Sequence, residues 1–330
     1  MRPELYGAVL ALAAGSALAE APAAECGPLM IVARIDLVPS TDGRAEFVPV
    51  EIAGSKRLML LDTGSGSTVL SRKVADELGL SAHRSNIRLY SVTGSYSDTA
   101  VNAPLDVGGL KSPKIEFVLA PEGMIGTDSD MAGILGADIL RSFDVSVDFA
   151  ANKLDLVSQV HCDGKVVYWA ERPVAIVPFD LLKSGHVSLP VAVDGQTVKA
   201  ILDTGAAGST LDQHTAEYRY GLKMGSTDAP ASGTLNGEKG SMVWHHTFKT
   251  LTFEGVTVTN PVFDIIPDRV SKHFDDKQLG SLISRPDEQV EPQVLLGMNV
   301  LRHLHVYIAY KEKKVYITPA GTPQPAQPKS

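Results

Sequence analysis

The 330-residue sequence offers little that would bind nucleic acid or span a membrane. Its net charge is −8, its charged residues make up 21% of the chain, and no basic patch stands out. Nucleic-acid-binding proteins need clustered positive charge, so we expect no such partner. After residue 19 no apolar run reaches the roughly eighteen residues of a membrane helix. What is left is a globular chain long enough for two domains of ordinary size.

Clusters of metal ligands are also missing. His245 and His246 are adjacent, and neighbouring residues of a strand point to opposite faces, so they do not easily share one ion. His303 and His305 share a strand face, but no Cys, Asp or Glu at ligand spacing accompanies them. We therefore expect surface or core histidines, no metal site and no organic cofactor.

The first residues have the pattern of a secretory signal peptide. Residues 1–19 combine Arg2, an apolar stretch from Leu5 to Leu18 and the small-residue end Ala17-Leu18-Ala19. Glu4 offsets Arg2, so an uncleaved anchor is the alternative. We expect an exported protein, periplasmic if the source is Gram-negative and otherwise secreted, with no membrane span once the signal is removed.

The most informative feature is a repeat. The tripeptide Asp-Thr-Gly occurs at Asp62-Thr63-Gly64 and again at Asp203-Thr204-Gly205, and each copy follows a short apolar run. The upstream sequences align without a gap, with Pro49 and Pro190 each thirteen residues before the aspartate. Each copy reads as a hairpin that turns at Gly54 or Gly195 and whose second strand delivers the aspartate.

The repeat continues downstream of both aspartates. Each copy has an apolar-apolar-Gly element, Ile134-Leu135-Gly136 in the first and Leu295-Leu296-Gly297 in the second. Two strand-like runs follow each element: 143–149 and 153–157, then 305–310 and 314–318. A repeat of this length indicates two similar domains within one chain.

The remaining sequence consists mostly of short β-runs separated by Gly, Pro, Asn and Asp, with two short helices that end at Gly79 and Gly221. We predict an all-β, bilobal fold with pseudo-two-fold symmetry, made of two β-barrel lobes with short helices. The stretch from Arg269 to Pro292 is polar and has no equally long counterpart, so we expect a surface insertion. The predicted segments are 1–19 signal peptide, 20–46 N-terminal segment, 47–160 first lobe, 161–185 interlobe connection, 186–318 second lobe and 319–330 disordered tail.

Only two cysteines, Cys26 and Cys162, occur in the chain. In an oxidising compartment they are expected to form one disulfide that ties the N-terminal segment to the interlobe connection. Such a bond is a structural staple and has no catalytic role. The part from Glu20 to Ser40 is expected to be a structural strand, with a short pro-segment as the alternative.

Two aspartates on matching loops meet if the lobes pack about a two-fold axis. Like charges a few ångströms apart cannot both ionise, so Asp62 and Asp203 would share one proton. The charged carboxylate can then take a proton from water while the protonated carboxyl donates to a carbonyl oxygen. This chemistry supports direct hydrolysis of a peptide bond without a covalent intermediate.

The neighbouring residues fit the same role. Gly64 and Gly205 permit close approach to the carboxylates, to which their N–H groups can donate. Thr63 and Thr204 can direct their hydroxyls across the two-fold axis and lock the opposite loop.

The position after each glycine differs between the copies, with Ser65 in the first loop and Ala206 in the second. A hydroxyl at Ser65 can bond Asp62 and favour its ionised form, which Ala206 cannot do for the other aspartate. We therefore predict that Asp62 carries more of the charge.

Each copy also has a polar, Gly-bearing segment between its aspartate and its second Gly element. These segments are expected to be hairpins, with tips at Val92-Thr93-Gly94 in the first copy and Asn236-Gly237 in the second. A mobile hairpin in this position could cover a bound substrate. An ordinary surface hairpin is the alternative.

The two loops, Asp62-Thr63-Gly64-Ser65 and Asp203-Thr204-Gly205-Ala206, together with the two apolar-apolar-Gly elements, resemble those of aspartic proteases of the pepsin and retropepsin clan. The resemblance runs from Phe47 to Thr318, and the lobe size is that of the compact retropepsin-like unit. The chain thus resembles a secreted bacterial-type protein with tandem lobes. A glycosidase would also use two carboxylates, but nothing in its mechanism calls for two matching loops.

The resemblance implies an acid-protease fold with Asp62 and Asp203 as the catalytic dyad, Thr63 and Thr204 as interlocking residues, and the two hairpin tips as flaps. It implies an aspartic endopeptidase that acts on a peptide or protein. We expect a monomer, because the tandem makes dimerisation of a lobe with another chain unnecessary. The alternative function is a catalytically silent peptide-binding protein with the same fold.

Overall fold

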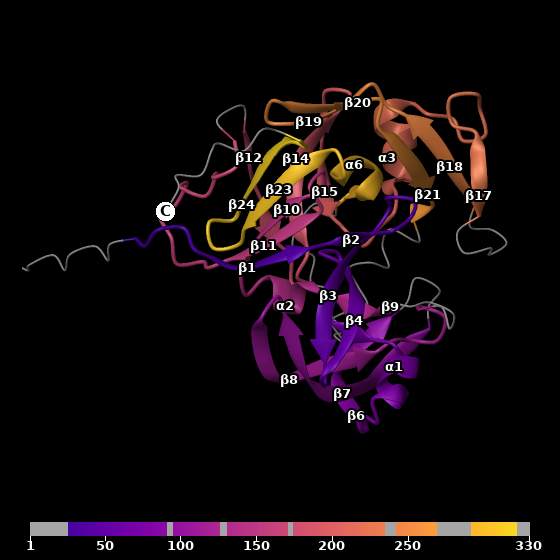
Figure 1. Cartoon of the computed structure of the whole chain (residues 1–330). Coiled ribbons are helices and arrows are strands. Elements are labelled where there is room, and N and C mark those ends of the chain that lie inside the picture. Colours follow the sequence, from indigo (N-terminus) through magenta and orange to yellow (C-terminus); the bar gives the residue numbers. More distant parts are fainter. Residues whose placement is uncertain are drawn as a thin grey trace, which may run out of the picture.

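A computed structural model describes residues 26–90, 95–125, 131–170, 174–234, 242–268 and 292–321. Strands dominate these ranges and helices are few and short, which confirms the predicted all-β, bilobal class (Figure 1). The predicted signal peptide, the segment 269–291 and the tail from residue 322 lie outside the described residues. No helix in the described ranges is long and apolar enough to cross a membrane.

The first lobe is built on a sheet with the strand order β2-β3-β4-β9-β5-β8-β7-β6. Its strands are β2 (Val38–Pro39), β3 (Glu46–Ile52), β4 (Ser55–Leu61), β5 (Val69–Leu70), β6 (Ala82–Tyr90), β7 (Tyr96–Val107), β8 (Leu110–Leu119) and β9 (Met131–Leu135). Helices α1 (Arg72–Glu77) and α2 (Ala137–Leu140) accompany it. Alternate residues of β3 are buried, as expected for a strand with one face on a core.

The second lobe repeats this plan in a sheet with the order β17-β18-β21-β16-β22-β15-β14-β19-β20, and β13 pairs with β14. Its strands are β13 (Asp180–Leu181), β14 (Val187–Val193), β15 (Gln196–Leu202), β16 (Ser209–Asp212), β17 (Ala231–Thr234), β18 (Met242–Thr247), β19 (Thr250–Phe253), β20 (Val256–Thr259), β21 (Val262–Ile266) and β22 (Val294–Leu296). Its helices are α3 (Gln213–Tyr220) and α6 (Met298–Leu301).

The hairpins that lead to the aspartates have the same geometry in both lobes. Ala53 and Gly54 connect β3 to β4 with φ of 48° and 80°, and Asp194 and Gly195 connect β14 to β15 with 44° and 77°. Positive φ at both central residues is the mark of the two-residue turn that best fits the twist of a hairpin. The turns therefore lie at the predicted glycines.

A third sheet joins the two halves of the chain. It has the order β1-β11-β10-β23-β24-β12, with β10 from the first half paired to β23 from the second. Its strands are β1 (Ile31–Asp36), β10 (Asp144–Asp148), β11 (Lys153–Val157), β12 (Ala175–Pro178), β23 (Leu304–Ala309) and β24 (Lys314–Pro319). In Figure 1 it lies where the indigo and purple lobe meets the orange and yellow part. Both the N-terminal segment and the interlobe connection thus contribute a strand to this sheet.

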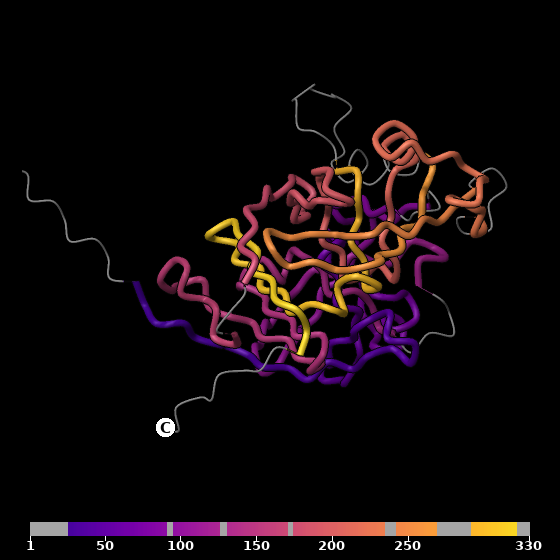
Figure 2. The backbone as a smooth tube through the Cα atoms, turned by 90° about the horizontal axis from the view of Figure 1, so that it is seen from above, coloured from indigo at the N-terminus to yellow at the C-terminus, as the bar shows by residue number. Residues whose placement is uncertain are grey.

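The interlobe connection is held at its start by a disulfide and a buried hydrogen bond. Cys26 is bonded to Cys162, and in Figure 2 the indigo start of the described chain runs beside this magenta segment. The side chain of His161, which precedes Cys162 in the sequence, lies 2.8 Å from the carboxylate of Asp144. The same carboxylate accepts the backbone N–H of Tyr310 at 3.0 Å. All three residues are buried, so this contact fixes the connection to the third sheet.

Candidate active site

The two aspartates directly follow equivalent strands. Asp62 comes after β4, which runs parallel to β9, and its amide donates to Leu135 O at 3.2 Å. Asp203 comes after β15, which runs parallel to β22, and its amide donates to Leu296 O at 3.0 Å. The apolar-apolar-Gly elements of the repeat therefore set the position of each aspartate.

Two threonines link the aspartate loops across the pseudo-two-fold axis. The Thr63 amide donates to Thr204 Oγ1 at 3.0 Å, and the Thr204 amide donates to Thr63 Oγ1 at 3.2 Å. The Thr63 hydroxyl donates to Leu202 O at 2.8 Å, and the Thr204 hydroxyl donates to Leu61 O at 2.7 Å. Each hydroxyl bridges backbone groups of the other lobe, and both threonines are buried.

The carboxyl groups of Asp62 and Asp203 are hydrogen-bonded to each other. Asp62 Oδ1 accepts the Gly64 amide at 2.8 Å, and Asp203 Oδ1 accepts the Gly205 amide at 2.9 Å. Each carboxyl also packs on the glycine of the opposite loop. A Cβ placed on Gly64 would lie 2.3 Å from Asp203 Cγ, and one placed on Gly205 would lie 2.3 Å from Asp62 Cγ. The site therefore has room only for glycine at both positions.

Burial raises the pKa of both aspartates, and the total rise is larger for Asp62. The negative charge of Asp203 adds to the rise at Asp62, whereas the hydrogen bond that Asp62 donates holds the pKa of Asp203 down. Asp203 also accepts a second backbone N–H, from Ala206 at 3.1 Å. Because the pKa of Asp62 is raised more, we expect a singly protonated pair to carry its proton on Asp62 and its charge on Asp203.

The contact on which the prediction of a more charged Asp62 rested is absent. That prediction required the Ser65 hydroxyl to donate to Asp62, but it donates to the Ser67 carbonyl at 2.8 Å. The backbone does not distinguish the two carboxyls in this way, since the amides of Gly64 and Ser65 lower the pKa of Asp62 and those of Gly205 and Ala206 lower the pKa of Asp203.

A second pair of hydroxyls, which the sequence analysis did not single out, supports the loops from behind. Thr68 Oγ1 accepts the Gly136 amide at 3.1 Å and donates to Asp138 Oδ1 at 2.6 Å. In the second lobe Ser209 Oγ accepts the Gly297 amide at 3.0 Å and contacts Asn299 Oδ1 at 2.7 Å. These contacts are equivalent in the two lobes.

The repeat contained the signal for these pairs. Thr68 and Ser209 each lie six residues after their aspartate, and Asp138 and Asn299 each lie two residues after the glycine of the apolar-apolar-Gly element. The equal offsets, together with the exchange of one hydroxyl residue for the other, could have identified them.

His186 is a further group at the site that the repeat could not reveal. Its Nε2 donates to the Gly64 carbonyl at 2.7 Å, and Ser184 Oγ lies 3.0 Å from Nδ1. The side chain is buried, and its positive charge when protonated favours ionised Asp203. The corresponding position in the first copy is Ala45, so no pattern marks the histidine.

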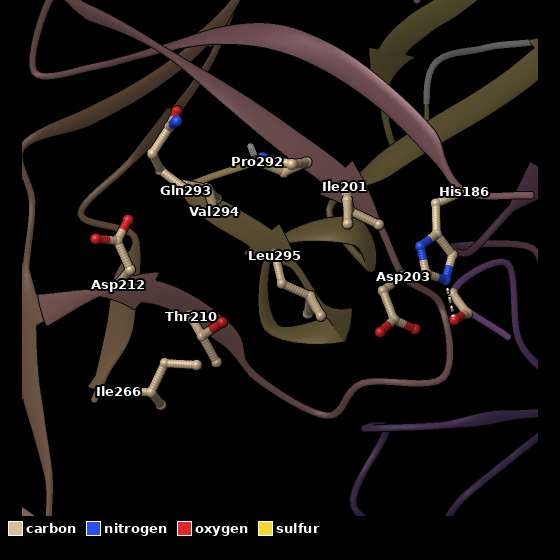
Figure 3. Close-up of a pocket in the computed structure, with 11 residues that line it drawn as sticks. His186, Ile201, Asp203, Thr210, Asp212, Ile266, Pro292, Gln293, Val294 and Leu295 are labelled. Carbon is tan, nitrogen blue, oxygen red and sulfur yellow. Dashed lines mark hydrogen bonds between the residues drawn. The ribbon is translucent and has the colours of Figure 1, made fainter. Parts of the chain in front are cut away.

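A pocket opens beside Asp203 in the second lobe (Figure 3). Strands β15, β16 and β22 form its wall, and His186 and Gly64 border it at the aspartate. The lining residues are Gly64, His186, Ile201, Asp203, Thr210, Asp212, Ile266, Pro292, Gln293, Val294 and Leu295.

The predicted hairpin tips, Val92-Thr93-Gly94 and Asn236-Gly237, lie outside the described residues, and their role as flaps stays a prediction. The strands that lead to them are described. Tyr90 pairs with Tyr96 at the ends of β6 and β7, with ring centroids 5.7 Å apart. In the second lobe β17 pairs with β18.

The histidines considered as metal ligands have other neighbours. His305 Nε2 lies 2.9 Å from Ser146 Oγ, and its ring stacks on Trp169. His246 Nδ1 donates to the Asp228 carbonyl at 2.6 Å. Among the described residues no group of three or more His, Cys, Asp or Glu side chains is arranged to hold a metal ion.

Comparison with known families agrees with this geometry. A family model described as aspartyl protease matches residues 48–139 and again 189–300, so it covers each lobe separately. The chain therefore belongs to the aspartyl protease family. No curated protein matches the chain.

Proposed function

We propose that the protein is an exported aspartic endopeptidase in which Asp62 and Asp203 form the catalytic pair. The observation that carries this proposal is the pair of half-buried, mutually hydrogen-bonded carboxyls on loops locked together by two threonines. Membership of the aspartyl protease family supports the choice of a peptide bond as the target.

The asymmetry of the pair assigns a role to each carboxyl. Ionised Asp203 takes a proton from a water molecule as the water oxygen bonds to the peptide carbonyl carbon. Protonated Asp62 donates its proton to the carbonyl oxygen at the same time, which yields a neutral diol. Asp62 then takes a proton back from one hydroxyl, Asp203 passes its proton to the amide nitrogen, and the C–N bond breaks. The pair returns to its starting protonation, with no covalent intermediate and no cofactor.

The surrounding groups hold this arrangement in place before substrate arrives. The amides of Gly64 and Gly205 donate to the carboxylates of their own loops, and the two threonines fix the loops relative to each other. Such preorganisation avoids reorienting dipoles during the reaction. Ser65 has a supporting role through the Ser67 carbonyl.

Two observations support the remaining parts of the proposal. The disulfide between Cys26 and Cys162 fits a protein that folds in an oxidising compartment, as export requires. Both carboxyls and both threonines come from a single chain, so a monomer suffices for activity. Purification from the exported fraction, N-terminal sequencing and light scattering would test cleavage of the signal and the oligomeric state.

The direct test is cleavage of a peptide library by the mature protein between pH 3 and 8, beside Asp62→Asn and Asp203→Asn. Each variant keeps the shape of the side chain but cannot cycle a proton, so we expect turnover to fall by about a thousandfold or more. Circular dichroism and a melting curve would confirm folding. Peptide binding without cleavage by the parent at any pH would instead establish the silent binding protein.

A further inference from the structure

The wall of the pocket beside Asp203 is a row of side chains that crosses three strands. Side chains alternate along a strand, so Ile201 of β15 faces the same side as Asp203. Ile201 is paired with Leu295 of β22, and Leu295 is paired with Thr210 of β16. Figure 3 shows Leu295 and Thr210 between Asp203 and Asp212. A largely apolar path therefore leads from the aspartate pair into the second lobe.

Asp212 stands at the far end of this path. It is the last residue of β16 and is only 9% exposed. Its Oδ1 accepts the Thr215 amide at 2.8 Å, as the N-cap of α3. Its Oδ2 is buried and has no hydrogen-bond partner among the described residues. A buried carboxylate oxygen without a partner is costly, so its presence in the wall of a pocket needs a reason.

Capping of the helix does not supply that reason. The corresponding residue of the first lobe is Ser71, which caps α1 by accepting the Val74 amide at 3.2 Å. A serine hydroxyl therefore serves as the cap in one lobe, and serine and aspartate are about equally good at this position. The charge and the second oxygen of Asp212 exceed what the cap requires.

The rest of the row also differs between the lobes. Thr210 corresponds to Val69, which is fully buried in an apolar cluster with Ile134. In the second lobe the equivalent face borders the pocket and carries a hydroxyl and a carboxylate. The polar character is thus particular to the second lobe.

The basic residue on the same face of β15 does not neutralise Asp212. Lys199 is two residues before Ile201, and its Nζ donates to Asp180 Oδ2 at 2.8 Å. Its backbone amide donates to Gln293 Oε1 at 3.0 Å. Asp212 therefore presents its negative charge to the pocket without a cationic partner among these neighbours.

We propose that this pocket is a specificity subsite for a lysine or arginine side chain of the peptide substrate, with Asp212 as the charge partner. The inference rests on the proposed protease function and adds the class of side chain that the site selects. The aliphatic stem would lie on Ile201, Leu295 and the Thr210 methyl, and the cationic head would donate to Asp212 Oδ2. Roughly 13 Å of strand separates the row of Asp203 from that of Asp212, at about 3.3 Å per residue, so the cationic head would lie well away from the scissile bond.

The test compares two fluorogenic peptides that differ at one position, where lysine is replaced by norleucine, a neutral residue of similar length. Each position on either side of the scissile bond is examined in turn. The enzymes are the parent, Asp212→Ser, which introduces the residue of the first lobe and keeps a cap, and Asp76→Ser, which removes an exposed charge as a control. Asp212→Asn takes the place of Asp212→Ser in this comparison if the serine variant does not fold.

At one position we expect the parent to favour lysine over norleucine by at least about tenfold in kcat/KM, as for a hydrogen bond between charged groups. Asp212→Ser should lose this preference, because kcat/KM for the lysine peptide falls relative to that for the norleucine peptide, and Asp76→Ser should retain it. Equal cleavage of both peptides by the parent at every position would overturn the subsite and leave the protease function standing.

Binding gives a second measurement that does not depend on turnover. Fluorescence anisotropy of the same peptides is recorded with Asp203→Asn and with Asp203→Asn carrying Asp212→Ser. A preference for lysine that disappears in the double variant supports the subsite even if the parent proves inactive, in which case only the protease function fails. Equal affinity for the two peptides in both proteins would contradict the subsite.

Discussion

Thr63 and Thr204 exchange the same pair of hydrogen bonds, with each hydroxyl accepting the backbone amide of the other residue at 3.0 and 3.2 Å. This symmetry is expected for two copies of one structural unit, although few of the residues around the two threonines are identical. Each hydroxyl also donates to a carbonyl one residue before the opposite aspartate. The lobes are thus joined at the point where the two carboxyls must meet.

Replacement of Thr63 by valine tests this junction. The change keeps the shape of the side chain but leaves the Thr204 amide and the Leu202 carbonyl buried without a partner. We expect the free energy of unfolding to fall by about 2 to 6 kcal/mol, since each of the two groups costs about 1 to 3 kcal/mol. Urea denaturation measures the change. Thr63→Ser keeps the hydroxyl and should lose far less, and an equal loss in both variants would show that packing of the methyl group matters more.

Replacement of Gly205 by alanine tests the close approach of the loops. The new methyl group would lie 2.3 Å from Asp62 Cγ, so the carboxyl must move away from Asp203. We expect at least about a hundredfold loss of kcat/KM, because small displacements of catalytic groups are costly. Gly208→Ala is the matched control in the same loop, where the methyl would meet Asp264 Oδ2 at an ordinary 3.6 Å. Comparable activity in the two variants would contradict the steric argument.

Much of the aspartate site could be predicted from the sequence because its loops and flanking strands occur in both copies of the repeat. The turns at Gly54 and Gly195 and the crossing of the threonines follow from equal spacing in the two copies. A residue that has the same role in both lobes occurs at the same place in each copy of the repeat. The alignment needs no knowledge of distant contacts.

Features without a counterpart were missed for the same reason. His186 aligns with Ala45, so nothing in the repeat marks it. The third sheet depends on the pairing of β10 with β23, more than 150 residues apart, and a strand pattern does not identify its partner. The predicted hydrogen bond from Ser65 to Asp62 is absent because a serine hydroxyl can also donate to nearby backbone carbonyls. Ser65 donates to the Ser67 carbonyl, a contact that the sequence does not show.

The pH dependence of activity should reflect the raised pKa values of the pair. Catalysis needs one ionised and one protonated carboxyl, so kcat/KM rises as Asp203 ionises and falls as Asp62 loses its proton. Burial raises the pKa of both groups, and we therefore expect both limbs of the profile above about 3.9, the ordinary value for aspartate. Initial rates in buffers of constant ionic strength measure the profile. A descending limb below that value would contradict the assignment.

Stability should also depend on pH through Glu46, a buried residue at the start of β3. Burial raises the pKa of Glu46 to about 7, and its Oε2 has no hydrogen-bond partner among the described residues. The folded protein therefore holds this proton more tightly than the unfolded chain does. The stabilising contribution is complete below the ordinary pKa near 4.5 and is lost as the pH rises through about 7.

Glu46→Gln should remove this pH dependence, because glutamine is neutral at every pH. We expect the variant to be more stable than the parent at pH 8, by at most about 3 kcal/mol, and to differ little from it at pH 4. Thermal unfolding at pH 4, 6 and 8 measures the difference. Glu51→Gln is the control, since it lies on the exposed face of the same strand. A stability gap between parent and Glu46→Gln that stays constant from pH 4 to 8 would mean that the pKa of Glu46 is the same in the folded and unfolded protein, against the raised pKa.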